Sequence, residues 1–334
     1  MRLITTLFLG SVLSLLSACN DSHAESTSST NTNIKSTSTE TILNNYKTEK
    51  VAPHTYVIHG PLEMPTKANK GFMNNPGFII IEKSVVVVDP GSSVQVGREL
   101  VSRIKAMTKN PITHVFNSHV HGDHWLGNQA IKEAFPAASF YAHPMMIKSA
   151  KAGEADHWVN LMDKLTEGLT KGTTAVIPTQ ALTDKQTIIV DNIHFIAHLS
   201  KIAHSETDAM IEVVEDKLLF TGDNITSQRL PRMTDGSFAG NIAAANTGLA
   251  LDITTVVPGH GLTGDKTVLE DYRDYLDGII KNVTTLAEED DLEAFEMKPI
   301  IMEKLAKYKD WSGFEEQVGK HISLAIAEIE ESGF

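Results

Sequence analysis

Four potential metal ligands fall within the short segment HVHGDH: His119, His121, Asp123 and His124. An extended backbone would point the alternating His119 and His121 the same way. Gly122 would let the chain turn, so that Asp123 and His124 could reach the opposite side. One metal ion could not use all four side chains comfortably. Imidazoles with a carboxylate are typical ligands of zinc, or of iron or manganese, so the segment predicts half of a two-metal site.

Three more candidate ligands follow, each after an apolar stretch that is typical of a strand. His204 follows residues 193–199, Asp223 follows the sequence KLLFTG, and His260 ends the sequence TVVPGH. Rigid strand ends would hold these side chains in place. His198 is an alternative to His204, because a lone histidine near an apolar strand is typically a core residue with one hydrogen bond. The Ser-x-Thr-Asp context that follows favours His204.

These segments resemble the metallo-β-lactamase superfamily over roughly residues 51–264. The resemblance rests on the ordered pattern His-x-His-x-Asp-His, a single His, Gly-Asp and Pro-Gly-His. It implies an α/β fold, a four-layer αβ/βα sandwich, and a site for two Zn²⁺ ions, with Fe or Mn as alternatives. It assigns His119, His121 and His204 to the first metal, Asp123, His124 and His260 to the second, and Asp223 to both as a bridge.

Three polar residues near these segments are expected to support the ligands. Asp89 follows the apolar run 85–88 and resembles the family's buried aspartate at the first strand-to-helix turn. We expect it to orient the ligand loop rather than to bind metal. We expect the same supporting role for Thr207 and Asp208, just beyond His204.

The periodicity of apolar residues predicts the elements that position the ligands. The first half should contain antiparallel strands at 56–58, 78–81 and 85–88, a helix at 94–107 and a strand at 113–117. The second half should contain strands near 186–190, 193–198, 209–214, 217–220 and 254–257. From residue 265 onward two apolar stripes predict helices that pack on the core or mediate a homo-oligomer contact: Val268, Tyr272, Tyr275, Ile279, and Val318, Ile322, Ala325, Ile329.

The N-terminus resembles a bacterial lipoprotein signal. The apolar run 3–16 is short for a membrane span, and it leads to Leu-Ser-Ala before Cys19, the only cysteine of the chain. We expect a lipid on Cys19 that anchors the protein to the periplasmic face of a bacterial membrane. Asn20 permits sorting to the outer membrane, the location we expect.

The predicted organisation has four parts. A signal peptide spans 1–18, a Ser/Thr-rich tether 19–50, the catalytic domain 51–264 and a helical extension 265–334. The tether is too polar to bury a core. Export would load the site outside the cytoplasm, where zinc is the default metal.

Charge narrows the expected partners. The formal net charge is −13, and no cluster of Lys or Arg is visible along the sequence. Phosphate backbones need such clusters, so we expect no nucleic-acid partner and a small-molecule substrate instead.

Two segments are expected to shape a substrate pocket. Residues 62–73 lie where relatives carry a flap over the metals, and Met64, Phe72 and Met73 could touch an apolar substrate, with an ordinary loop as the alternative. Residues 143–174, which contain His157 and Trp158, are longer than a minimal connection and could form a partly helical lid.

The predicted function is a metal-dependent hydrolase in which a metal-bridged hydroxide cleaves an ester, lactone, thioester or amide bond in a small molecule. Asp123 is the catalytic candidate that guides the proton. Asp223 is followed three residues later by Thr226, whereas β-lactamases with a bridging-position Cys typically carry a Lys there. The Asp bridge resembles the glyoxalase II and lactonase branches, and Arg229 or Arg232 could hold an anionic substrate, with a solvated surface loop as the alternative.

Three other functions remain as alternatives. β-Lactamase activity is one, and an iron-dependent redox member of the superfamily, such as a dioxygenase, is another. A non-catalytic binding lipoprotein is the third, although binding alone would not require the whole ligand set.

Overall fold

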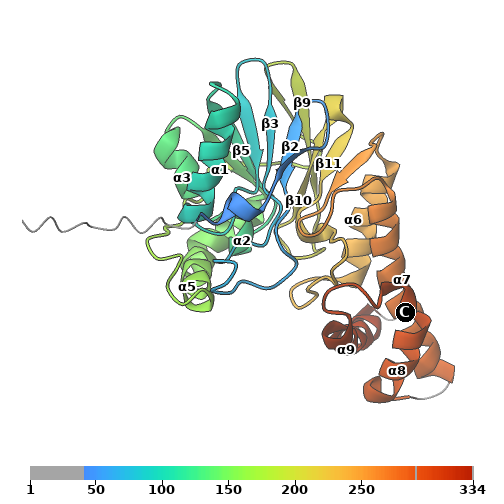
Figure 1. Cartoon of the computed structure of the whole chain (residues 1–334). Coiled ribbons are helices and arrows are strands. Elements are labelled where there is room, and N and C mark those ends of the chain that lie inside the picture. The colour runs from blue at the N-terminus through green and yellow to red at the C-terminus, as the bar shows by residue number, and fades with distance from the viewer. Residues whose placement is uncertain (1–40, 290–291, 333–334) are drawn as a thin grey trace, which may run out of the picture. The chain divides into compact units, whose positions relative to one another are not determined.

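Two mixed β-sheets face each other in the computed structural model, which describes residues 41–289 and 292–332 (Figure 1). The first sheet runs in the order β1 (Thr48–Lys50), β2 (Thr55–Ile58), β3 (Gly77–Ile80), β4 (Val85–Val88), β5 (Ile112–Asn117), β6 (Ser139–Ala142), β7 (Gln180–Ala181). The second runs in the order β12 (Thr255–Val257), β11 (Leu218–Phe220), β10 (Ala209–Val213), β9 (Ile193–Leu199), β8 (Thr187–Val190).

Each sheet combines antiparallel and parallel pairs. In the first sheet β1 to β4 are antiparallel, whereas β4 to β7 are parallel. In the second sheet only β11 and β12 pair in parallel. Successive side chains of β4 point to opposite faces of the sheet, so this strand contributes to two hydrophobic clusters. Val86 and Val88 pack with Phe195 and Phe220 between the sheets, while Val85 and Val87 face the helices.

Helices cover the outer faces of both sheets. Beside the first sheet lie α1 (Val94–Met107) and α3 (Asn128–Ala134), and beside the second lie α6 (Phe238–Ala250) and α7 (Thr267–Glu289), as Figure 1 shows. The remaining helices are α2 (Gly122–Trp125), α4 (Pro144–Ser149), α5 (Ala155–Leu165), α8 (Ala294–Lys304) and α9 (Phe314–Ser332), and the short helical turns are η1 (Leu43–Asn45), η2 (Ala150–Glu154), η3 (Val214–Asp216), η4 (Gly222–Asn224) and η5 (Ala306–Tyr308). The predicted α/β fold with four layers and C-terminal helices is confirmed.

The C-terminal helices belong to the core over the second sheet. Both predicted stripes pack there: Tyr272, Tyr275 and Ile279 of α7 are fully buried, as are Val318 and Ile322 of α9. The division between catalytic domain and helical extension stays a prediction.

Residues 43–50 differ from the predicted tether, because they form η1 and β1. The Leu43 side chain is buried, and the carboxylate of Glu99 accepts hydrogen bonds from the backbone N–H groups of Ile42 and Leu43 at 2.7 and 2.6 Å. Arg103 donates to the carbonyls of Leu43 and Tyr46. These long-range contacts order a polar segment whose own sequence gives no such indication.

The predicted signal peptide, Cys19 and the tether up to residue 40 lie outside the described residues. Within the described ranges, no helix combines the length and the apolarity that crossing a membrane requires.

Candidate metal centre

All seven predicted ligands gather at one edge of the two sheets. The segment after β5 carries four of them, the β9–β10 loop carries His204, η4 after β11 carries Asp223, and the residues after β12 carry His260. Three groups each place their donor atoms within 4.8 Å of one another: His119, His121, His204; His119, His124, Asp223; and Asp123, His124, His260. Every member of these groups is buried.

His119 and Val120 form a bend, so the extended backbone predicted from His119 to His121 is present only at His121, whose φ is −66° and ψ is 134°. Gly122 begins α2, and its φ is not in the positive region. A Cβ at this position would lie 2.9 Å from the Cβ of Trp158, so glycine is needed here for close packing rather than for a turn. The short helix still separates Asp123 and His124 from the two preceding histidines.

The three histidines of the first group, His119, His121 and His204, lie close together. His121 Nδ1 lies 3.0 Å from His204 Nε2, and the ring of His119 lies 4.7 Å from the ring of His121 and 4.9 Å from that of His204. The three imidazoles therefore converge on one point.

Asp223 lies between this group and the second one. Its Oδ1 is 3.2 Å from His124 Nε2, and its Oδ2 is 3.2 Å from His260 Nε2 and 3.6 Å from His204 Nε2. Asp123 Oδ2 completes the second group at 3.3 Å from both His124 Nε2 and His260 Nε2. One carboxylate thus contacts donors of both groups.

The hydrogen bonds of the imidazoles fit a metal site. His119 Nδ1 lies 2.9 Å from Ser118 Oγ, His124 Nδ1 lies 2.9 Å from Asp89 Oδ2, and His260 Nδ1 donates to the Met73 carbonyl at 2.9 Å. These contacts turn each Nε2 toward the centre.

Several of these inward atoms are buried and have no hydrogen-bond partner among the residues that the structure describes. They are His119 Nε2, His124 Nε2 and Asp223 Oδ1. Orphaned buried donors and acceptors are costly unless another group satisfies them, and metal ions would do so. The residues present therefore fit the metals that the sequence predicts.

Burial and mutual repulsion keep the first histidine group neutral. Burial lowers the pKa of His121 to about 4 and that of His204 to about 3, and it holds the pKa of His119 well below its ordinary value. Neutral imidazole is the form that binds metal, so this group needs no deprotonation near neutral pH.

The negative charge of the site comes from Asp123 of the second group and from Asp223 between the two groups. Burial alone would raise the pKa values of Asp123 and Asp223, but His124 and His260 outweigh it and hold both pKa values well below the ordinary range. For His124, burial lowers the pKa, and the carboxylates of Asp123, Asp223 and Asp89 together raise it well above its ordinary value. The site thus presents two carboxylates to a cation.

Asp89 has the supporting role that the sequence predicted. Its carboxylate accepts hydrogen bonds from the Ser118 backbone N–H at 2.8 Å and from Ser118 Oγ at 2.6 Å, besides contacting His124. Its φ of 49° lies in the left-handed region, which is unfavourable for a non-glycine residue. Ser118, which links Asp89 to His119, was not predicted, and only its place beside His119 could have indicated it.

Gly259 lets the β12 loop pass against the central carboxylate. Its N–H donates to the Gly222 carbonyl at 2.8 Å, and a Cβ at Gly259 would overlap Asp223 Oδ1. Gly222 itself has a φ of 52°. Both glycines are therefore needed where the two loops cross.

Of the other predicted residues, His198 lies away from the seven donors, whereas Thr207 and Asp208 bond to residues beside them. His198 lies in β9 and contacts Glu212 at 2.8 Å, away from the seven donors, so it is not an alternative to His204. Thr207 Oγ1 accepts from the Val120 N–H, and Asp208 accepts from the Ser205 N–H and hydroxyl. Burial raises the pKa of Asp208 to about 7.

A small cavity of about 50 Å³, here called the metal cavity, opens onto the donors. Met64, Met73 and Trp158 line it with His121 and Asp123, so the flap and the lid both reach the site. The segment 143–174 is partly helical, as predicted, because α4, η2 and α5 lie within it. Phe72 was predicted wrongly: it is fully buried in the core under α1, where its ring meets Tyr46.

Solved structures support the fold. A metallo-β-lactamase from Pontibacter korlensis shares 16% identity at a TM-score of 0.55, with 70% of this chain and 99% of that chain covered. DIM-1 metallo-β-lactamase shares 17% identity at a TM-score of 0.55, with 70% of this chain and 96% of that chain covered. VMB-1 shares 17% identity at a TM-score of 0.52, with 68% of this chain and 94% of that chain covered. No curated protein matches the chain.

A family model described as the metallo-beta-lactamase superfamily matches residues 69–260. This match runs from the flap to His260, the last of the seven donors, and spans more than half of the sequence. The chain therefore belongs to the metallo-β-lactamase superfamily.

Proposed function

We propose that the protein is a metal-dependent hydrolase with two metal ions, zinc by default, that cleaves an ester, lactone, thioester or amide bond. The observation that carries the proposal is the position of Asp223, whose two oxygens contact histidines of both groups. A single carboxylate between two sets of buried donors is suited to two adjacent cations.

The donor sets divide between the two ions. His119, His121 and His204 would hold the first, and Asp123, His124 and His260 would hold the second. Asp223 would contact both. When bound, the metals supply Lewis acidity, which lowers the pKa of water and polarises a carbonyl oxygen.

The chain's own residues then orient and exclude water. Asp123 Oδ2 remains a carboxylate because His124 and His260 lower its pKa, so it is our candidate to accept a hydrogen bond from the attacking water and guide its proton. Met64, Met73 and Trp158 narrow the metal cavity around the reacting atoms. Trp158 lines the metal cavity, and its Nε1 is buried with no hydrogen-bond partner among the described residues, so it is our candidate donor to substrate.

An Asp bridge favours hydrolysis of the glyoxalase II or lactonase type over β-lactam hydrolysis. Thr226 stands three residues after Asp223, and its hydroxyl donates to the Arg229 carbonyl at 2.8 Å, so it has a structural partner. The β-lactamases named above share the fold, and β-lactam turnover is the second candidate that their likeness favours.

The cellular setting is a separate part of the proposal. We infer that the protein is exported and held by a lipid on Cys19 at the periplasmic face, with the outer membrane as the expected location. The support is the sequence around Cys19 alone.

A substrate panel tests the reaction class. Zinc-loaded protein is assayed with a lactone, a thioester, an aryl ester, nitrocefin and a phosphodiester. We expect turnover of one acyl class, loss of that turnover in Asp123→Ala, and wild-type turnover in the control Asp310→Ala, an exposed residue. Hydrolysis of nitrocefin alone would favour the second candidate, and turnover that survives chelation would contradict the proposal.

A further inference from the structure

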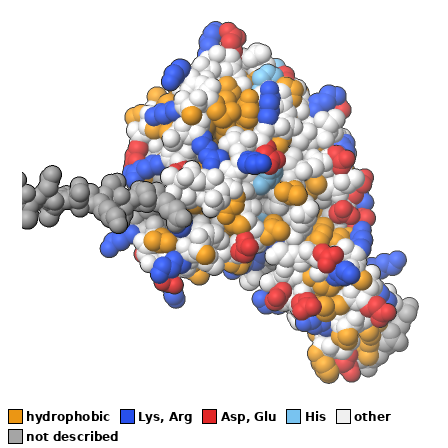
Figure 2. Space-filling model, in the orientation of Figure 1, with side chains coloured by type: hydrophobic (Ala, Val, Ile, Leu, Met, Phe, Trp, Pro, Cys, Tyr) orange, Lys and Arg blue, Asp and Glu red, His pale blue; other side chains and the backbone are white. Residues whose placement is uncertain are grey.

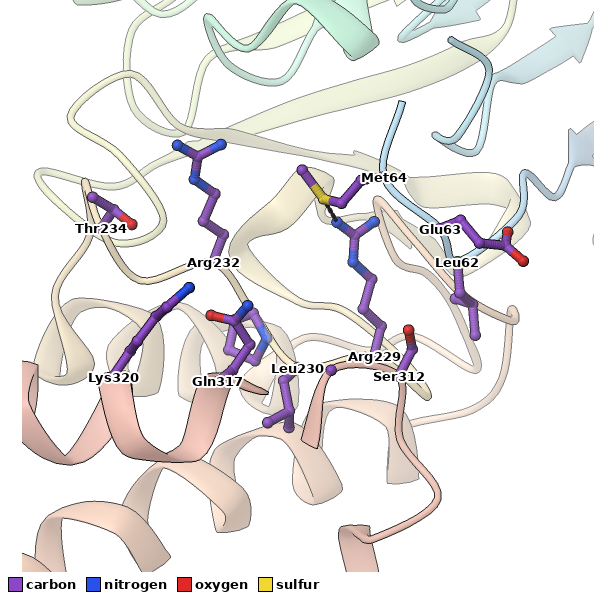
Figure 3. Close-up of a pocket in the computed structure, with 12 residues that line it drawn as sticks. Leu62, Glu63, Met64, Arg229, Leu230, Arg232, Thr234, Ser312, Gln317 and Lys320 are labelled. Atoms are coloured by element: carbon purple, nitrogen blue, oxygen red, sulfur yellow. Dashed lines mark hydrogen bonds between the residues drawn. The ribbon is translucent and has the colours of Figure 1, made fainter. Parts of the chain in front are cut away.

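A second cavity of about 430 Å³, here called the basic cavity, adjoins the metal cavity (Figure 3). The two share Met64, Arg229 and Arg232 among their lining residues. The basic cavity then extends to α9, where Lys320 lines it. Its volume is typical of a small-molecule site, and the shared residues place it beside the metal ligands.

Three cationic side chains, those of Arg229, Arg232 and Lys320, line this cavity. In Figure 3, Arg232 and Lys320 lie at the left of the view and Arg229 lies to their right beside Met64, whereas the carboxylate of Glu63, the one acidic lining residue, is directed away from both arginines. Figure 2 shows Lys and Arg scattered among acidic side chains on the face that it draws. A concentration of positive charge stands out in a chain of net charge −13.

These cations lack anionic partners within the described ranges. Arg232 and Lys320 form neither an ion pair nor a side-chain hydrogen bond there. Arg229 Nη2 donates to the weak acceptor Met64 Sδ at 3.1 Å, and Arg229 Nη1 is buried with no partner among the described residues. An unsatisfied guanidinium N–H beside a cavity is suited to an incoming oxyanion.

The C-terminal segment fixes the loop that carries both arginines. The Leu230 N–H donates to the Ser312 carbonyl, and the Ser312 N–H donates to the Gln228 carbonyl, each at 2.9 Å. His321 Nε2 on α9 donates to the Pro231 carbonyl at 3.0 Å. The loop is therefore held in place before substrate binds, which lowers the entropic cost of binding.

A neighbouring cavity, which shares His121 and Trp158 with the metal cavity, has the reverse charge. This third cavity, of about 480 Å³, is lined by Glu154, Glu206 and Asp235, with Arg232 at the boundary. The anionic end of a substrate would be attracted to the basic cavity and repelled from this acidic cavity, and this would orient the scissile bond of the substrate.

We propose that Arg229, Arg232 and Lys320 form a subsite for an anionic oxygen group, a carboxylate or a phosphate, on the substrate of the proposed hydrolase. This proposal rests on that hydrolase function, and it adds that the helix α9 supplies a specificity determinant from outside the ligand loops.

Direct binding tests the subsite without turnover. The zinc-loaded protein is heated with succinate, inorganic phosphate or the neutral dimethyl succinate. We expect at least one of the two anions to raise the melting temperature, Lys320→Met and Arg232→Met to reduce that shift, and Lys320→Arg to retain it. The control Lys304→Met, an exposed residue of α8, should keep the wild-type shift. Stabilisation by succinate or by phosphate identifies the kind of anion, and equal shifts in wild type and Lys320→Met for both anions would overturn the proposal.

Turnover separates this proposal from the hydrolase itself. The mono-4-nitrophenyl ester of succinic acid is compared with its methyl diester. We expect Lys320→Met to raise the KM of the anionic ester by about tenfold relative to the neutral ester, the size typical of a lost charged hydrogen bond. Equal KM ratios in wild type and variant would contradict the subsite alone. Failure of the wild type on both esters and on the acyl substrates of the panel, with anion binding intact, would contradict the hydrolase alone.

Discussion

The carboxylate of Asp89 lies 2.9 Å from Nδ1 of His124, on the side of the ring opposite to Asp223. Asp89 does not reach the metal groups itself, yet it fixes the tautomer of His124 and raises its basicity. Its left-handed φ keeps the same carboxylate on Ser118. The loop of predicted ligands is therefore held by a residue outside the seven donors.

Asp89→Asn should weaken zinc binding. Asparagine tolerates a positive φ, so the change removes mainly the charge beside His124, and we expect affinity to fall roughly 10- to 100-fold. Competition with a coloured chelator measures it. The matched control is Asp191→Asn, because Asp191 also has a positive φ but accepts from the Lys83 N–H far from the site. Equal affinity in the two variants would show that Asp89 does not tune the ligand.

Gly259→Ala should disrupt the centre although glycine is no ligand. The added methyl group would overlap Asp223 Oδ1, so the loop or the carboxylate must shift. We expect the bound metal, measured by elemental analysis, to fall to one ion or fewer. Gly319→Ala is the control, because its Cβ would make only an ordinary contact with Lys298. Full metal content in Gly259→Ala would mean that the crossing of the loops tolerates a side chain.

His321 should make the fold sensitive to acid. Burial lowers its pKa to about 4, so between about pH 6.5 and pH 4 the unfolded chain binds a proton that the folded chain does not. Stability should therefore fall as pH falls through this window, with up to about 3 kcal/mol of the loss due to His321. Urea unfolding of wild type and His321→Gln at several pH values measures it. The variant keeps a donor for Pro231, and an unchanged pH slope would contradict the prediction.

Cys19→Ser should release the protein from membranes. The expected lipid is attached at this thiol, so labelled palmitate should enter the wild-type protein in bacterial cells and not the variant. Fractionation should move the variant to the soluble periplasmic fraction. Absence of the label from the wild-type protein would contradict a lipid anchor on Cys19.

The sequence predicted the elements around the ligands because each ligand follows a short apolar strand. It did not predict α6, whose buried residues are Phe238, Asn241, Ala244, Ala245 and Gly248. Small and polar residues give no apolar stripe. Asn241 is buried because its side chain donates to the Ala203 carbonyl and accepts from Tyr272, contacts that only the folded chain creates.

The same reason explains what was missed at the site. The donors could be predicted from residue type and order, since a metal requires those chemical groups. Lys320 could not, because its place beside Arg232 depends on how α9 packs nearly ninety residues later in the sequence. Phe72 was assigned to the pocket because apolar residues beside a site and apolar residues of the core look alike in sequence.

Metal content and hydrolysis of wild type and Asp223→Ala, measured on the same samples, test the central claim most directly. The account predicts about two zinc ions per wild-type chain and turnover of one acyl class, with both metal and turnover lost in the variant because Asp223 contacts both groups. One iron per wild-type chain without hydrolysis, or full turnover in the variant, would contradict it.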